Sequence, residues 1–475
     1  MKPSKDYLTN VIAQGGSRAF TMASSFIVFI MIARVLGAEQ VGQYALVMAF
    51  ILVAGNFAEF GITAALSKEL PAIRDRSHEE ASVYFGNYLL LREILAVAVL
   101  VLALIIVGFL QPVQFEPLII GSFAIPFIGG RFTETVYQIY QRPVYTLYSS
   151  TWLAISQLGM AAVLLLYFEV GVSGFIYGYV VTQFLYFALS IYLAAKLVPP
   201  RFNVQKHILS GIAVIGIPVG FWTMFNVIST RADVFMLSYL RSVEELGIYN
   251  VAYRLLDLGI AMAVTVATPL IPVLSRRFKE DAVATRQLCV RVLEVSIALA
   301  LVAPLLLPGL SSFIVLTLFG PEFAASVPLV SVFAWVFFMI AIMYMGMSIN
   351  LALGDLHYSW WSGLLAAITN VALNAILIPR LGAMGAAYSA MASNAVMLTI
   401  TLYYVRHNVG QLVPASRLLR IVLAGAGCLL LQQAFQGEFS VYFMPVVLVV
   451  YLLGLAILGF FPRHLINLKK APGRN

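Results

Sequence analysis

The sequence predicts an all-helical membrane protein that crosses the bilayer many times. Hydrophobic residues make up 61% of the 475-residue chain and charged residues only 11%. A soluble core cannot hide that much apolar surface. The apolar residues also gather into segments of about 20 residues or more, which is the length an α-helix needs to cross about 30 Å of hydrocarbon. Together these observations indicate a polytopic α-helical protein.

About fourteen apolar segments are bounded by Gly, Pro and charge clusters. The first starts near Val11 and runs past Val35 without a small-residue cleavage site, so we interpret it as a retained helix and not as a signal peptide. The predicted spans are residues 11–36, 41–66, 84–110, 117–138, 146–168, 172–195, 208–239, 246–272, 289–317, 327–352, 357–378, 381–405, 415–435 and 441–461.

The positive charges predict the orientation of these spans. The net charge is +8, and nearly all of it lies in alternate loops, whereas Arg241 and Arg380 are the only basic residues in the opposite loops. Because cytoplasmic loops carry the excess of Lys and Arg, both termini are predicted to be cytoplasmic. We expect the protein to lie in the cytoplasmic (inner) membrane. The charge is therefore explained by topology, and we expect no nucleic-acid partner.

Two internal alignments indicate a duplicated chain. Residues 34–44 align with residues 239–249 at an offset of 205, and residues 170–177 align with residues 381–388 at an offset of 211. Six helices per copy give both copies the same orientation, as in the parallel repeats of many transporters. We expect a six-helix lobe at 1–200, a second at 201–410, and an extra helix pair with a cytoplasmic tail at 411–475.

Four charged residues lie inside two predicted spans that flank one short outer turn. Each costs at least about 2.5–3.5 kcal/mol in hydrocarbon, so each must face protein or water. Their depth allows two pairs across the turn, with Asp233 beside Arg254 and Arg231 beside Asp257. These can be internal salt bridges or a substrate or ion site. The repeat mates are all apolar, which favours a site: Phe26, Val28, Ala49 and Leu52.

Arg18 and Glu59 form a second candidate pair. Both lie about twenty residues from the turn at residues 37–41, which places them at the cytoplasmic mouth. They are either an interfacial ion pair, with the Arg18 side chain reaching toward water, or the place where an anionic lipid head enters.

The sequence gives little support for an enzymatic function. The five His fall in predicted cytoplasmic loops or ends, and neither they nor the two Cys are spaced as a metal site requires. A phosphate-binding loop motif for ATP hydrolysis is absent from the sequence. The outer loops are of about 5–10 residues, short for the catalytic domain of a membrane glycan polymerase or ligase. We expect no catalytic residue, no metal and no cofactor.

Three stretches carry a family resemblance: residues 33–44, Asp233 with residues 247–254, and residues 370–387. Together they resemble the polysaccharide-transport (Wzx-like flippase) branch of the multidrug/oligosaccharidyl-lipid/polysaccharide (MOP) exporter superfamily, over essentially the whole chain. Many relatives stop at twelve helices, which leaves the role of residues 415–461 open. The resemblance implies a flippase that moves an undecaprenyl-pyrophosphate-linked oligosaccharide, an O-antigen or exopolysaccharide repeat unit, to the outer leaflet by alternating access.

We combine the resemblance with the charges to assign roles. The substrate's pyrophosphate is expected to bind Arg18, Arg231 and Arg254, because a guanidinium suits phosphate. Coupling to H⁺ or Na⁺ is expected at Asp233, Asp257 and Glu59. Expected partners are the lipid-linked oligosaccharide, membrane lipids and a polysaccharide polymerase. Three rivals stay open: a cation-coupled multidrug exporter of the same superfamily, a membrane polymerase or ligase, and a membrane scaffold.

Overall fold

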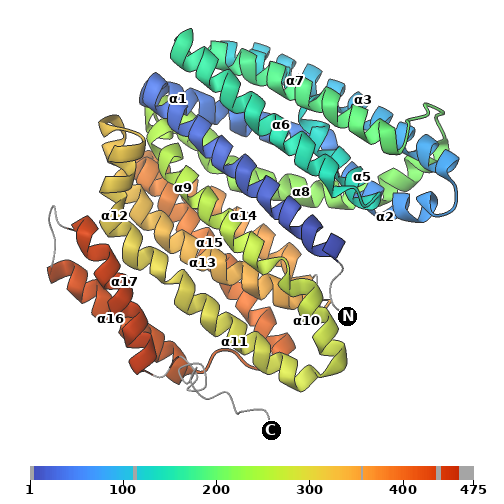
Figure 1. The fold of residues 1–475 in the computed structure, drawn as a ribbon. Coiled ribbons are helices and arrows are strands. Elements are labelled where there is room, and N and C mark those ends of the chain that lie inside the picture. The colour runs from blue at the N-terminus through green and yellow to red at the C-terminus, as the bar shows by residue number, and fades with distance from the viewer. Residues whose placement is uncertain (1–4, 111–114, 355–356, 435–439, 459, 461–475) are drawn as a thin grey trace. The chain divides into compact units, whose positions relative to one another are not determined.

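The computed structural model describes residues 5–110, 115–354, 357–434, 440–458 and 460. Within these ranges the secondary structure is helical and includes no strand, which confirms the all-helical prediction (Figure 1). Eight helical segments of the described chain are long and apolar enough to cross a membrane, so the protein is a multi-pass membrane protein: Phe20–Glu59, His78–Leu110, Pro143–Tyr167, Val172–Leu197, Val243–Glu280, Ala282–Leu318, Pro321–Ala352 and Trp361–Leu381.

The chain forms two compact units, residues 1–250 and 251–475. Helix α9 (Val243–Ala267) begins in the first unit and ends in the second. The other helices of the first unit are α1 (Lys5–Glu59), α2 (Ile62–Arg74), α3 (His78–Leu110), α4 (Phe115–Ser122), η1 (Ile128–Arg131), α5 (Phe132–Ile139), α6 (Pro143–Ala161), η2 (Ala162–Tyr167), α7 (Val172–Leu197) and α8 (Lys206–Leu240).

The second unit holds the remaining helices. They are α10 (Leu270–Glu280), α11 (Ala282–Ala300), α12 (Val302–Leu318), η3 (Pro321–Ser326), α13 (Val327–Ala352), α14 (His357–Leu381), α15 (Ala383–Val409), α16 (Ala415–Ala434) and α17 (Ser440–Ile457). Every one of the fourteen predicted segments overlaps helices of the structure, although the number of spans stays a prediction. The predicted lobes at 1–200, 201–410 and 411–475 rest on the sequence repeat and also stay a prediction.

Helix α1 contains the first predicted turn as a single break. Gly37 has φ 77° and ψ 178°, a conformation that glycine adopts without steric cost, and helix continues on both sides of it. The helix ends at Glu59, before the boundary predicted near residue 66. Two residues with positive φ, Phe60 and Gly61, then turn the chain into α2.

The predicted span 117–138 is an interrupted helix. α4 ends at Ser122, turns follow, and a short 3₁₀ segment (η1) leads into α5. Pro126 supplies no backbone N–H inside this interruption, which is why a continuous ladder of helical hydrogen bonds cannot form there. Interrupted helices leave backbone carbonyls free for other donors, and in membrane proteins they are tolerated where protein groups satisfy those carbonyls.

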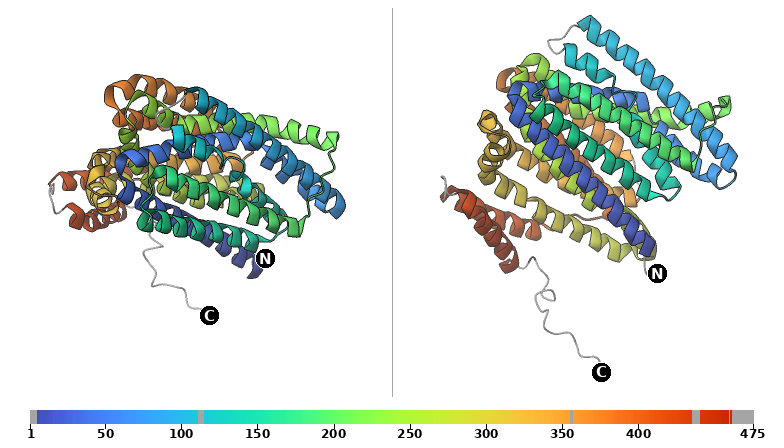
Figure 2. Two further views of the ribbon diagram at one scale, coloured as in Figure 1. Left: turned by 90° about the horizontal axis from the view of Figure 1, so that it is seen from above. Right: turned by 45° about the horizontal axis from the view of Figure 1, so that its top comes forward.

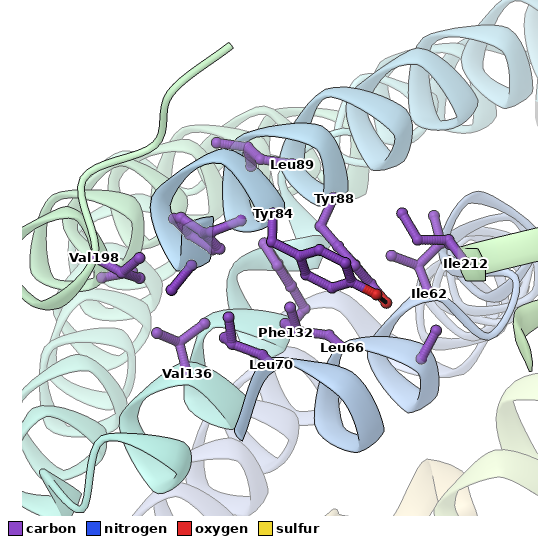
Figure 3. Packing of buried hydrophobic residues seen from close by; sticks show 14 of the residues in the cluster. Ile62, Leu66, Leu70, Tyr84, Tyr88, Leu89, Phe132, Val136, Val198 and Ile212 are labelled. Atoms are coloured by element: carbon purple, nitrogen blue, oxygen red, sulfur yellow. Dashed lines mark hydrogen bonds between the residues drawn. The ribbon is translucent and has the colours of Figure 1, made fainter. Parts of the chain in front are cut away.

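The core of the first unit joins α2, α3 and α5. Ile62, Leu66, Tyr84, Tyr88 and Phe132 pack there among other buried side chains (Figure 3). Next to this cluster, the segment that leads to α8 is fastened to α3. The Asn87 side chain donates to the Asn203 carbonyl at 2.6 Å and accepts from the Gln205 N–H at 3.1 Å. Both ends of one amide group thus hold the connection between α7 and α8.

In the second unit α13 packs against α11, α12 and α15. Helices α16 and α17 run side by side (Figure 2) and pack on α12. The Tyr451 hydroxyl donates to the Ala298 carbonyl of α11 at 2.9 Å, and Met444 of α17 lies against Gly309 of α12, where a Cβ atom would meet it at 2.3 Å. The C-terminal pair is therefore an integral part of this unit.

Candidate functional site

Asp233 on α8 is the most deeply buried of the four charged residues that the sequence places in the spans around the outer turn, with 4% exposure. Its carboxylate accepts a short hydrogen bond from the Tyr249 hydroxyl of α9 and a second, at 2.9 Å, from the Val234 N–H. Arg231, two residues earlier on the same helix, is half-buried and attracts the carboxylate electrostatically. The sequence did not indicate the role of Tyr249, since its repeat mate, Tyr44, has no acidic partner at the equivalent position.

Arg254 and Asp257 share one face of α9, as their spacing predicted. Arg254 Nη1 lies 3.9 Å from Asp257 Oδ2, and the side chains are 27% and 33% exposed. A pair this long and this exposed contributes little to stability. The predicted pairs Asp233–Arg254 and Arg231–Asp257 join residues on either side of the boundary at Asn250 and stay a prediction.

The other predicted pair, Arg18 with Glu59, cannot be traced as a contact, because the side chain of Arg18 lies outside what the structure describes. Glu59 is half-buried at the end of α1, and its carboxylate accepts a hydrogen bond from the Thr63 N–H at 2.9 Å. An acidic group there satisfies one of the free N–H groups at the start of α2 and opposes the positive end of the helix dipole. The sequence analysis did not anticipate this capping function.

A buried charged cluster in the first unit escaped the sequence analysis. Arg92, in the middle of α3, is 2% exposed and pairs with Glu93. The same guanidinium donates to the Pro126 carbonyl in the interruption between α4 and α5, and it lies 5.6 Å from the centre of the Phe187 ring. A Cβ on Gly129 would come within 1.9 Å of Arg92 Cζ, so any larger residue there would displace the guanidinium.

The neighbouring glycine makes room for a second polar contact. A Cβ on Gly130 would lie 2.6 Å from the ring of Tyr186, whose hydroxyl donates to Glu134 Oε1 at 3.3 Å. The available signal was two adjacent charges inside the predicted span 84–110, which the strong apolarity of residues 95–110 concealed. The interruption is thus fixed from both sides by polar side chains of α3 and α7.

A second missed cluster lies in the other unit. Glu294 on α11 is 2% exposed and pairs with Arg291 at 2.8 Å and with Arg417 of α16 at 2.9 Å. Arg291 also donates to the Phe460 carbonyl at 2.9 Å. These contacts attach the C-terminal helix pair to α11.

Buried amides line the contact between α14 and α15. Asn374 donates to Asn370 Oδ1 at 2.9 Å, and Asn370 donates to Ser393 Oγ at 3.4 Å. Across the part of the chain that the structure describes, His, Cys, Asp and Glu side chains form no group of three or more that could hold a metal ion. The contact between α14 and α15 thus contains two amides and a hydroxyl that bind one another.

The comparisons with known structures show the fold. A lipid II flippase, MurJ, in an inward closed conformation matches with a TM-score of 0.78 at 15% identity, over 97% of this chain and 100% of its own. An inward-facing multidrug resistance MATE family transporter of the MOP superfamily matches with a TM-score of 0.68 at 14% identity, over 82% of this chain and 94% of its own. A MOP superfamily transporter from Pyrococcus furiosus matches with a TM-score of 0.60 at 15% identity, over 84% of this chain and 94% of its own.

No curated protein matches the sequence. A family model described as "Polysaccharide biosynthesis protein" matches residues 7–278, which is more than half of the chain and includes α8 and α9 with Asp233 and Tyr249. The fold is that of the MurJ and MATE transporters, and the chain belongs to the polysaccharide biosynthesis protein family.

Proposed function

We propose that this protein is a flippase that moves an undecaprenyl-pyrophosphate-linked oligosaccharide from the cytoplasmic to the outer leaflet of the inner membrane by alternating access. The observation that carries the proposal is the agreement of two findings. The family is described by polysaccharide biosynthesis, and the fold of a lipid II flippase extends over 97% of the chain and all of that flippase. A lipid-linked glycan is a substrate class that agrees with both the family description and the fold of a lipid II flippase.

The C-terminal helix pair supports the same proposal. The flippase structure covers 97% of this chain and the MATE structure covers 82%. α16 and α17 pack on α12 and bind α11 through the Arg417–Glu294 ion pair and the Tyr451 hydroxyl, so they are a stable part of the second unit. We assign them to the apolar polyprenyl tail of the substrate, whose length calls for an apolar surface.

The charged residues then take the roles that the sequence assigned to them. We assign the pyrophosphate to Arg254, which shares a face of α9 with Asp257, together with Arg231 and Arg18. Asp233, buried and held by a hydroxyl, is the first candidate for the coupling cation, H⁺ or Na⁺, followed by Asp257 and Glu59. A polysaccharide polymerase would receive the translocated product.

The second candidate is a cation-coupled multidrug exporter, because MATE transporters share the fold. The two functions differ in the charge that the transport path must accept. An anionic pyrophosphate favours the arginines of α8 and α9, whereas a cationic drug is repelled by them.

Deletion of the gene in its host separates the two functions. A probe that reaches only the outer face would measure lipid-linked oligosaccharide in each leaflet. The flippase proposal predicts that the complete repeat unit accumulates on the cytoplasmic leaflet and that surface polysaccharide is lost. An unchanged lipid-linked pool and surface glycan, with increased sensitivity to cationic dyes, would instead establish the drug exporter.

A further inference from the structure

Helices α1 and α9 cross at two glycines with almost no space between their backbones. A Cβ atom on Gly42 would lie 1.8 Å from the Val243 carbonyl oxygen, and a Cβ on Gly247 would lie 1.9 Å from the Ala38 carbonyl oxygen. Real Cβ atoms never come so close to a carbonyl, so only glycine fits at either position. All four residues belong to the first unit.

The two contacts are mates of each other under the sequence repeat. The offset of 205 that aligns residues 34–44 with residues 239–249 pairs Ala38 with Val243 and Gly42 with Gly247. Gly42 therefore faces the carbonyl of Val243, which is the repeat mate of Ala38. Gly247 in turn faces the carbonyl of Ala38 itself, so the two contacts are equivalent. This reciprocity is the signature of a local two-fold axis through the crossing.

The crossing fixes the backbone that carries Tyr249. This residue follows Gly247 by two positions and is fully buried, and its hydroxyl donates to the Asp233 carboxylate. Two features determine the position of the hydroxyl. One is the short connection between α8 and α9, and the other is the close packing of the first turns of α9 against α1.

We propose that Tyr249 is the positioning residue of Asp233, and that the reciprocal glycine crossing holds Tyr249 in place. This inference rests on the proposed function, in which Asp233 binds the coupling cation. The Tyr249 hydroxyl occupies a lone pair of the carboxylate and stabilises its ionised form. This hydrogen bond favours the unliganded, ionised carboxylate and so competes with a proton or Na⁺ for it. Cation binding at Asp233 therefore weakens the contact with the Tyr249 side chain.

The consequence is a defined change in cation affinity. Without the hydroxyl, Asp233 loses one donor that competes with the cation, and the half-saturating cation concentration falls roughly tenfold, the equilibrium equivalent of one hydrogen bond to a charged group. Alanine at Gly42 or Gly247 pushes the first turns of α9 away from α1, and this moves the Tyr249 hydroxyl away from Asp233. The half-saturating cation concentration therefore also falls in these variants. The double variant Y249F/G42A shifts it no further than Y249F.

The test measures the thermal stability of the purified full-length protein in detergent. NaCl is titrated against choline chloride at constant ionic strength, and a pH series in choline chloride forms the second arm. A ligand that binds only the folded protein raises its Tm with concentration, which yields the half-saturating value without any glycan substrate. The variants are D233N, Y249F, G42A and G247A. Gly159→Ala on α6 is the matched control, because a Cβ there meets nothing within 4 Å.

The expected pattern is loss of cation dependence in D233N, a lowered half-saturating concentration in Y249F and in both glycine variants, and wild-type behaviour in Gly159→Ala. If D233N abolishes the dependence while Y249F stays within twofold of wild type, the positioning role of Tyr249 is overturned and the coupling role of Asp233 stands. If D233N keeps the dependence, or wild type shows none for either cation, both ideas are overturned. If Y249F does not fold, G42A and G247A take its place. A lowered half-saturating concentration in them supports the positioning role of Tyr249, and a value within twofold of wild type overturns it.

Discussion

Arg92 illustrates how one side chain can maintain an interrupted helix in an apolar environment. Its guanidinium binds the Glu93 carboxylate and the Pro126 carbonyl at the same time, and it lies close to Gly129. A lysine has a compact ammonium group in place of a planar fork and cannot reproduce this set of contacts. The residue type, and not only its charge, is therefore required at this position.

The Arg92–Glu93 pair should respond asymmetrically to substitution. Glu93→Gln leaves the guanidinium of Arg92 buried without its counter-charge, and we expect it to destabilise the protein by about 3 kcal/mol. The double variant R92M/E93Q removes both charges and should recover most of this loss. Denaturation of the purified protein in detergent measures both changes.

Glu80→Gln, on the exposed first turn of the same helix, is the matched control and should stay within about 0.5 kcal/mol of wild type. An E93Q variant as stable as this control would show that the pair contributes nothing to the fold.

At the scale of the element, the C-terminal helix pair depends on a carboxylate that two arginines share. Glu294 is 2% exposed, whereas the side chains of Arg291 and Arg417 are 33% and 46% exposed. The arginines can reach water when the carboxylate is lost, but the carboxylate cannot do so when the arginines are lost. The buried member of the network should therefore determine the cost of each substitution.

We expect R291M/R417L to destabilise the protein by about 3 kcal/mol or more, because it strands the Glu294 charge, and E294Q to cost only about 1 kcal/mol. Thermal unfolding in detergent measures the difference. Arg286→Met, an exposed position on the same helix, should have little effect. Equal costs for the two network variants would contradict this account of α16 and its attachment.

Particular elements show how far the sequence carries a prediction. Apolar length predicted segments that each overlap helices of the structure, and the glycine of the first predicted turn is the residue at which α1 breaks. The function of Glu59 as a cap was not predictable, because it depends on the left-handed turn at Phe60 and Gly61. Arg92 was overlooked, since its partner Pro126 lies 34 positions away and comes close only through the interruption of a helix.

The candidate site was predictable in part. The charges of α8 and α9 stand out because apolar spans rarely contain them, and the three-residue spacing placed Arg254 and Asp257 on one face. The hydrogen bond between Asp233 and Tyr249 was not predicted, because a buried tyrosine in an apolar helix has the same sequence signature whether or not it meets an acid.

For the whole molecule, the charge pattern predicts a topology that cysteine labelling can test. Glu322 lies in a predicted outer loop and Glu280 in a predicted cytoplasmic loop, and both are exposed. We expect E322C to react with a membrane-impermeant thiol reagent in intact cells and E280C to react only after permeabilisation. The native Cys289 and Cys428 are buried, so the background should be low, and the unsubstituted protein is the control. Labelling of E280C in intact cells would overturn the predicted orientation.

The reciprocal contact at Gly42 and Gly247 also couples the two halves of the repeat. Two surfaces that present the same residues to each other form an isologous interface, the kind by which identical subunits make a symmetric dimer. The two glycines therefore carry the same constraint, because a side chain at either one would meet a backbone carbonyl of the other helix. A substitution in one half of the repeat is thus felt at the matching position of the other half.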